Sequence, residues 1–212
     1  MSKKGIKHLV AILVIFYVVG IIGLSLDLTR ELFVQLIPFT ILMSNGLLVI
    51  FQKPKKVKHL LVFSVILIAG FLVEVIGVST GIIFGGYSYT NVLGFQLFNT
   101  PIILGFNWAM LVYMAYVIVD KLKINEWQKV VLSAVILVIY DLVLEPFAIF
   151  YGLWNWDAIN PPLQNYIAWF VISILFMLLV RSSKIKITNP VAIPLFLIQF
   201  LFFSVLYSIN SI

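Results

Sequence analysis

Two acidic residues, Asp141 and Glu145, stand inside an apolar run that is long enough to cross a bilayer. They are four residues apart, so a helix places both on one face. A carboxylate at membrane depth costs roughly 2.5 to 3.5 kcal/mol on insertion scales, and like charges one turn apart repel each other. Stability therefore does not explain the pair. Because carboxyl groups can donate and accept protons, this spacing predicts an active site at a membrane boundary.

A polar and aromatic segment follows the two acids directly. Its indole, phenol, amide and carboxyl side chains are Trp154, Trp156, Trp169, Tyr151, Tyr166, Asn155, Asp157, Asn160, Gln164 and Asn165. Tryptophan and tyrosine favour the boundary between a bilayer and water. We therefore expect this segment to cover the acidic face of the preceding helix.

A third acid, Glu74, also falls at membrane depth. It belongs to a stripe with spacings of 4, 3 and 4 residues: Gly70, Glu74, Gly77 and Gly81. Small residues in a stripe let a second helix approach closely, so Glu74 is expected to face protein. Counted from the basic end of each span at about 1.5 Å per residue, Glu74, Asp141 and Glu145 all lie about 16 to 23 Å deep. We predict that the three carboxyl groups share one site in the outer half of the bilayer.

The composition is that of an integral membrane protein. Of the 212 residues, 63% are hydrophobic and 10% are charged, and the mean hydropathy is +1.15. Apolar runs of about 17 to 25 residues predict spanning helices, not barrel strands. We expect an all-α, polytopic membrane helix bundle that forms a single integral domain over residues 1–212. Seven helices are predicted at residues 8–26, 32–51, 60–84, 102–119, 130–150, 166–180 and 191–207.

The connections between these helices carry further signals. A short outer turn is expected at residues 27–31, and Pro38 is expected to bend or pack the second helix. The segment 84–100 is too polar for a span, and we expect a surface or re-entrant segment that closes the site from outside. Pro101 is predicted to start the next helix, with Asn107 and Trp108 about two turns in.

Basic residues fall on alternate sides of the predicted helices. Thirteen of the fourteen lysines and arginines follow this pattern, and only Arg30 departs from it. The pattern predicts a multi-pass protein of the cell membrane with a cytoplasmic N-terminus and an outer C-terminus. The first apolar run is long for a signal peptide and is expected to remain as an anchor. No basic groove with interleaved aromatic residues occurs, so nucleic acid is not an expected partner, and no protein partner is indicated.

Several chemistries are excluded by residue type. Without cysteine the chain has no disulfide, no thiolate catalyst and no cysteine-ligated metal. The two histidines, His8 and His59, lie at basic boundaries away from the acids, so no metal site is expected. The last predicted helix has no lysine for a retinal Schiff base, and the sequence contains no P-loop, no GxSxG and no DDxxD motif.

Two blocks of short motifs occur in a specific order between residues 71 and 169. The first contains EVIG (74–77), TG (80–81), FGGYSY (84–89), LG (93–94), Pro101 and Trp108. The second contains DLVLEP (141–146), WNW (154–156), Pro162, NY (165–166) and Trp169. The ordered set resembles the membrane carotenoid hydratases, such as γ-carotene 1′,2′-hydratase and bisanhydrobacterioruberin hydratase. Residues 99–100 and 158–161 depart from the family pattern, which bears on the substrate more than on the reaction.

The resemblance implies that water is added across the terminal C1,C2 double bond of an acyclic carotenoid. Protonation of C2 forms a tertiary cation at C1, which water then captures. The implied carboxyl set is Glu74, Asp141 and Glu145, and aromatic faces would stabilise the cation by roughly 0.5 to 2 kcal/mol each. The implied substrate-binding residues are Tyr87, Tyr89, Pro101, Asn107, Trp108, Trp154, Trp156, Asn165, Tyr166 and Trp169. The expected partners are a lipophilic carotenoid, water and membrane lipid, without a cofactor.

Two other functions stay open at this point. A membrane lycopene cyclase needs the same acids, but an internal double bond captures its cation. The polar side chains of Asn155, Asn160, Gln164 and Asn165 favour access by water and thus hydration. A proton-coupled transporter could use buried carboxylates as a relay. The missing inverted repeat and the odd number of predicted helices count against a transporter.

Overall fold

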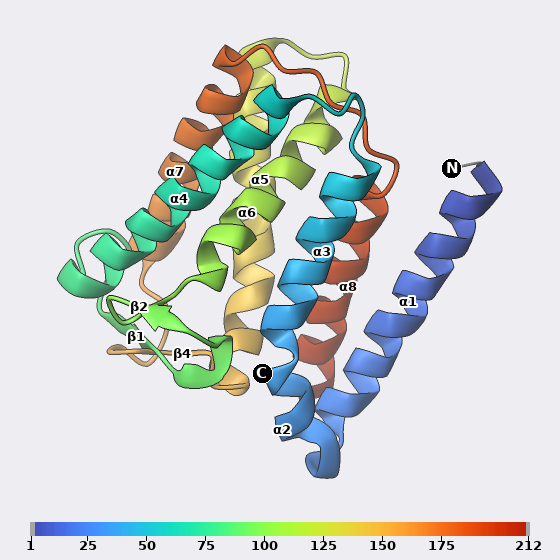
Figure 1. The fold of residues 1–212 in the computed structure, drawn as a ribbon. Helices are drawn as coiled ribbons and strands as arrows, with labels where there is room; N and C mark the ends of the chain where they lie inside the picture. Colours follow the sequence, from blue (N-terminus) through green and yellow to red (C-terminus); the bar gives the residue numbers. More distant parts are fainter. Residues whose placement is uncertain (1–2, 211–212) are drawn as a thin grey trace.

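The computed structural model describes residues 3–210, whose helices pack as a bundle (Figure 1). The helices are α1 (Lys3–Ser25), α2 (Asp27–Gln35), α3 (Ile37–Phe51), α4 (Val57–Thr80), α5 (Ile103–Asp120), α6 (Glu126–Phe150), α7 (Leu163–Ser182) and α8 (Ala192–Asn210). Six of these are long and apolar enough to cross a membrane. The short α2 and α3 meet at a bend of 50° and together make up to a seventh span. The prediction of a helical, multi-pass membrane protein is confirmed.

The outer turn expected at residues 27–31 is wrong, because α2 begins there at once. Side chains of α2 satisfy carbonyl groups that the end of α1 leaves without a helical donor. Thr29 Oγ1 donates to the Gly23 carbonyl at 2.7 Å. Arg30 Nε donates to the Leu24 carbonyl at 3.2 Å. The chain can therefore end one helix and begin the next without a loop.

Four short strands lie together with the 3-10 helix η1 (Asn91–Leu93) at one end of the bundle (Figure 1). Strand β1 (Tyr87–Tyr89) pairs antiparallel with β4 (Trp154–Trp156), and β2 (Gln96–Leu97) pairs antiparallel with β3 (Thr100–Pro101). Pro101 therefore lies in a strand, and α5 begins after it, so the prediction that Pro101 starts a helix is wrong. The β2–β3 turn uses positive φ angles at Phe98 and Asn99, 54° and 59°.

The opposite end of the bundle holds the start of α1 and the loops that join α3 to α4, α5 to α6 and α7 to α8 (Figure 1). These loops and the helix turns near them carry thirteen of the fourteen basic residues. Arg181 of α7 pairs with Glu126 and Asp120, and Lys129 also contacts Asp120 at 3.6 Å. The basic residues thus gather at one end of the bundle, while the cytoplasmic placement of that end stays a prediction.

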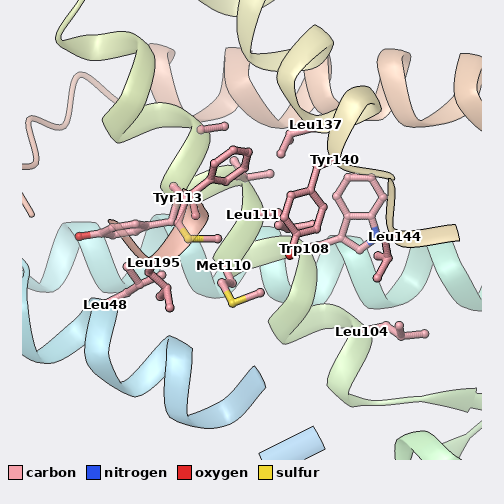
Figure 2. Close-up of a cluster of buried hydrophobic side chains, with 14 of the residues drawn as sticks. Leu48, Leu104, Trp108, Met110, Leu111, Tyr113, Leu137, Tyr140, Leu144 and Leu195 are labelled. Atoms are coloured by element: carbon pink, nitrogen blue, oxygen red, sulfur yellow. The ribbon is translucent and has the colours of Figure 1, made fainter. Parts of the chain in front are cut away.

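Helix α5 is the centre of the bundle and packs against α3, α4, α6, α7 and α8. Figure 2 shows its buried side chains among leucines and a tyrosine of the neighbouring helices. Glycines allow α4 to approach closely: a Cβ atom at Gly105 would lie 2.5 Å from the Leu67 carbonyl oxygen, and one at Gly70 would lie 2.6 Å from Trp108 Cβ. The predicted close approach of a second helix is confirmed at Gly70, whereas Gly77 faces Phe84 and Tyr87 of the segment that follows α4. Helix α1 packs against α2 and α8.

Candidate active site

Glu74, Asp141 and Glu145 line one cavity at the strand end of the bundle. Each carboxyl residue is buried, with 5%, 1% and 3% of its surface exposed. The cavity has a volume of about 30 Å³, which is enough for about one or two water molecules. Its other lining residues are Phe84, Tyr87, Tyr89, Leu104, Asn107, Leu144, Trp154, Trp156, Asn165 and Trp169. The geometry therefore brings the three predicted acids together; their catalytic role stays a prediction.

Glu74 accepts hydrogen bonds on both of its carboxyl oxygens. Trp108 Nε1 donates to Oε1 at 2.8 Å, and the hydroxyl groups of Tyr87 and Tyr89 donate to Oε2, each at 2.8 Å. Burial, and then the nearby Glu74 carboxyl, raise the pKa of both Tyr87 and Tyr89. The two phenols therefore keep their protons and remain donors. Three donors on one carboxyl group stabilise it as an acceptor.

Glu145 accepts hydrogen bonds from side chains of β4, the strand that pairs with β1. Trp154 Nε1 and Trp156 Nε1 donate to Glu145 Oε2 at 3.1 and 3.0 Å. Side chains two residues apart point to the same face of a strand. In the register, Tyr87 lies opposite Trp156 and Tyr89 lies opposite Trp154. The β1–β4 ribbon thus presents four O–H and N–H donors to two glutamates.

Asp141 differs from the two glutamates in its partners. Asn165 Nδ2 donates to Asp141 Oδ2 at 2.9 Å. Asp141 Oδ1 is buried and has no hydrogen-bond partner among the described residues. A buried polar atom without a partner is usually explained by a bound water molecule, a ligand or a catalytic role. Asp141 therefore combines a place in the cavity lining with one carboxyl oxygen that has no partner among the described residues.

The hydrogen-bond donors around the three carboxyl groups are all uncharged. None of the residues that line it is lysine, arginine or histidine. Three negative charges in a water-poor site without a counter-ion repel strongly. Carboxyl groups that share a site in this way tend to share protons as well. The arrangement therefore favours a proton on at least one of the three.

Seven of the ten predicted substrate-binding residues line the cavity, and three do not. The seven are Tyr87, Tyr89, Asn107, Trp154, Trp156, Asn165 and Trp169. Trp108 lies behind it, where its indole donates to Glu74 and stacks on Trp169 with ring centroids 4.1 Å apart. Pro101 and Tyr166 are not among the residues that line it.

Three lining residues were missed from the sequence: Phe84, Leu104 and Leu144. All three are apolar, so residue type gave no signal. Helical spacing could have found two of them, because Leu144 is three residues after Asp141 and Leu104 is three residues before Asn107. A search for the walls of the site along each helix face would therefore have recovered Leu104 and Leu144, but not Phe84, which lies outside the helices.

A larger cavity adjoins the carboxyl cavity. Its volume is about 150 Å³, and its walls come from α1, α2, α3, α5, α6 and α8. Four residues line both cavities: Leu104, Asn107, Leu144 and Trp154. The acids therefore lie beside a space that is mostly apolar and several times larger than their own cavity.

The match to a known family agrees with these features. A family model described as "Carotenoid biosynthesis protein" matches residues 32–211. Because this is most of the chain, the protein belongs to the carotenoid biosynthesis protein family and has a role in carotenoid biosynthesis. The resemblance to a carotenoid membrane family is thereby confirmed. Comparison with curated proteins and with solved structures gave no match.

Proposed function

We propose that the protein is a hydro-lyase that adds water across the terminal C1,C2 double bond of an acyclic carotenoid. One observation carries the proposal: the unpartnered, buried Oδ1 of Asp141 in a cavity that two further carboxyl groups line. The cavity has room for about one or two waters, which a hydration requires. Membership of a carotenoid biosynthesis family supports the class of substrate.

Asp141 is the proposed acid. Its proton passes to C2, and the electron pair of the double bond forms the new C–H bond, which leaves a tertiary cation at C1. Glu74 and Glu145 are poor proton donors by comparison, because O–H and N–H groups already donate to their oxygens. General acid catalysis of this kind contributes typically about 10²- to 10⁴-fold.

Glu145 is the proposed base. A water molecule in the cavity forms the C1–O bond with its lone pair and releases a proton to Glu145. Asn165 Nδ2 lies 2.9 Å from Asp141 and 3.5 Å from Glu145 Oε1. A proton transfer from Glu145 back to Asp141 restores the starting state. Atoms and charge balance without a nucleotide, a metal or a redox cofactor.

The remaining walls of the cavity stabilise the cation. Glu74 supplies negative charge, and the faces of aromatic rings stabilise a cation by roughly 0.5 to 2 kcal/mol each. Trp169 lines the cavity and is stacked on Trp108, so its orientation is fixed. Pre-organised groups of this kind need little rearrangement as charge develops.

The reaction is assigned to the cell membrane. A carotenoid is lipophilic, and the six apolar helices make the protein multi-pass. We treat residues 1–212 as one integral membrane domain with its basic end in the cytoplasm. The substrate then stays in the bilayer throughout, and only water has to reach the carboxyl cavity.

Isotope incorporation tests the proposal directly. Purified protein is supplied with lycopene in heavy-oxygen water and, separately, in deuterium oxide, and the pigments are analysed by mass spectrometry. Hydration places the heavy oxygen in a tertiary hydroxyl group and one non-exchangeable deuterium on the adjacent carbon. Conversion should also survive chelators and proceed without nicotinamide, flavin or ATP.

Other outcomes overturn the proposal in distinct ways. Uptake of deuterium without oxygen identifies a cyclase. Oxygen that comes from dioxygen identifies a hydroxylase and leaves the carboxyl groups without their assigned roles. A pigment of unchanged mass, together with proton-linked uptake by vesicles, identifies a transporter.

A further inference from the structure

The larger cavity has the chemical character of a site for a hydrocarbon chain. Its walls are almost wholly apolar or aromatic, including Phe33, Ile41, Phe147 and Phe202. Pockets for small molecules are typically apolar spaces with a few placed polar groups. Here the carboxyl groups lie just beyond Leu144, which lines both cavities. A molecule that fits both spaces has a reactive end and a long apolar body.

Hydrogen bonds join three of the polar side chains of this cavity, Tyr17, Tyr140 and Gln199. Gln199 Nε2 donates to Tyr17 Oη at 2.9 Å and to Ser44 Oγ at 3.3 Å. Tyr140 Oη donates to Gln199 Oε1 at 3.3 Å. The network links α1, α3, α6 and α8 and leaves these groups satisfied without a ligand. An apolar chain can therefore pass these side chains without leaving their polar atoms unpaired.

One side of the cavity reaches the outer surface of the bundle. Phe16 and Val19 of α1 are 38% and 49% exposed, and Leu36 between α2 and α3 is 43% exposed. All three also line the cavity. In a membrane, an exposed apolar surface of spanning helices faces lipid. The cavity thus has a mouth on the lipid side, between α1 and the bent pair α2–α3.

We infer that this cavity is the binding channel for the chain of a linear isoprenoid polyene, which enters from the bilayer between α1 and α3. The inference rests on the proposed function only for which end of the polyene reacts. The channel itself is inferred from the apolar residues that line the larger cavity. The terminal double bond passes Asn107 and Leu144 to reach the acids, and the far part of the chain stays in lipid. Helix α1 precedes the matched region 32–211, so the family match carries no information on this wall.

Filling the channel provides the test. Lycopene is achiral, so its visible absorption band shows circular dichroism only when a chiral site holds it. The signal is measured with protein in nanodiscs that carries Asp141→Asn, so that the probe is not consumed. Thr40→Trp fills the channel from α3, and Gly20→Leu fills it from α1, where a Cβ atom would lie 3.2 Å from Phe202 Cε2. Each substitution should weaken lycopene binding about tenfold or more.

Val18→Trp is the matched control. Val18 is 47% exposed and lies half a helix turn from Gly20, on the lipid-facing side of α1. This variant should keep the full lycopene signal. Gel filtration and thermal melting identify a variant that fails to fold. If one filling variant fails to fold, the lycopene signal of the other one tests the channel.

The outcomes separate the channel from the reaction. A lycopene signal that persists in both folded filling variants overturns the channel, as does the absence of any signal in the unfilled protein. A signal that filling removes while the active protein forms no hydrated pigment supports the channel and overturns the proposed function.

Discussion

The side-chain nitrogen of Asn165 lies 2.9 Å from Asp141 Oδ2 and 3.5 Å from Glu145 Oε1. One amide of α7 thus bridges two acids that stand a single turn apart on α6. Like charges at this spacing on a helix repel, and a buried amide donor between them offsets part of that cost. The bridge makes Asp141 and Glu145 a unit whose proton content depends on Asn165.

Asp141→Asn tests the acid. Asparagine keeps the size of the side chain but has no acidic proton, so conversion of lycopene should fall by about 10²-fold or more. The amount of folded protein and its melting temperature should change little, because an amide can still take part in hydrogen bonds. Conversion is measured by pigment analysis in a lycopene-producing host.

Asp27→Asn is the matched control for this loss. Asp27 pairs with Arg30 at 2.7 Å, and its side chain is 91% exposed. It belongs to α2, and no residue of α2 lines the carboxyl cavity. Conversion should be unchanged. Full activity in the Asp141→Asn protein would remove Asp141 as the acid and with it the proposed mechanism.

Asn165→Leu tests the bridge. The substitution removes the donor to Asp141 Oδ2, and a buried acceptor left without its donor costs about 1 to 3 kcal/mol of unfolding free energy. Conversion per folded protein should fall about 10- to 100-fold, because the two acids lose their shared partner. Urea or thermal unfolding gives the first value, and pigment analysis of purified protein gives the second.

Asn45→Leu separates a change in chemistry from a change in stability. Asn45 Nδ2 donates to the Phe106 carbonyl at 3.2 Å and to the Ile41 carbonyl at 2.9 Å, and Asn45 does not line the carboxyl cavity. This variant should be destabilised with conversion per folded protein unchanged. If both variants lost stability and activity in the same proportion, Asn165 would have only a structural role.

Much of the fold could be predicted from local patterns. Each spanning helix is a continuous apolar run, and the bilayer fixes its length. That Glu74, Asp141 and Glu145 lie at a similar level of the bundle also follows from counting along helices of constant rise. These features depend on residues that are close in the sequence, so the sequence is sufficient to predict them.

The β1–β4 ribbon could not be predicted in the same way. Tyr87 pairs with Trp156, and no local periodicity links two three-residue strands so far apart in the chain. The Trp and Tyr residues therefore appeared as a general aromatic cap, whereas the pairing assigns each one to a particular carboxyl group. The larger cavity was missed for a related reason, because it arises where side chains of six helices leave space between them.

Gly77→Ala tests the packing that positions a donor of Glu74. A Cβ atom at Gly77 would lie 2.6 Å from Phe84 Cδ2 and 2.9 Å from Tyr87 Oη. The methyl group must therefore displace Tyr87, whose hydroxyl donates to Glu74. Overpacking of this kind costs typically about 1 to 3 kcal/mol, and conversion should fall as well. Unfolding experiments and pigment analysis measure the two effects.

Gly46→Ala is the control for Gly77→Ala, because it makes the same change in α3 with no atom of another structural element within 4 Å of the new Cβ atom. Alanine favours a helix over glycine by about 0.5 to 1 kcal/mol, so this variant should be as stable as the parent or more so. Equal stability and activity of the two alanine variants would contradict the close packing at Gly77.

The orientation of the bundle gives the last prediction. The start of α1 and three basic loops lie at one end of the molecule, and α8 runs from that end to the other (Figure 1). Because basic loops are retained in the cytoplasm, a reporter inserted between α5 and α6 should be cytoplasmic, and one fused after Ile212 should be extracytoplasmic. Enzymatic reporters that are active on only one side of the membrane measure both. An extracytoplasmic signal from the first fusion together with a cytoplasmic signal from the second would contradict the predicted topology, and it would place the carboxyl cavity in the inner half of the bilayer.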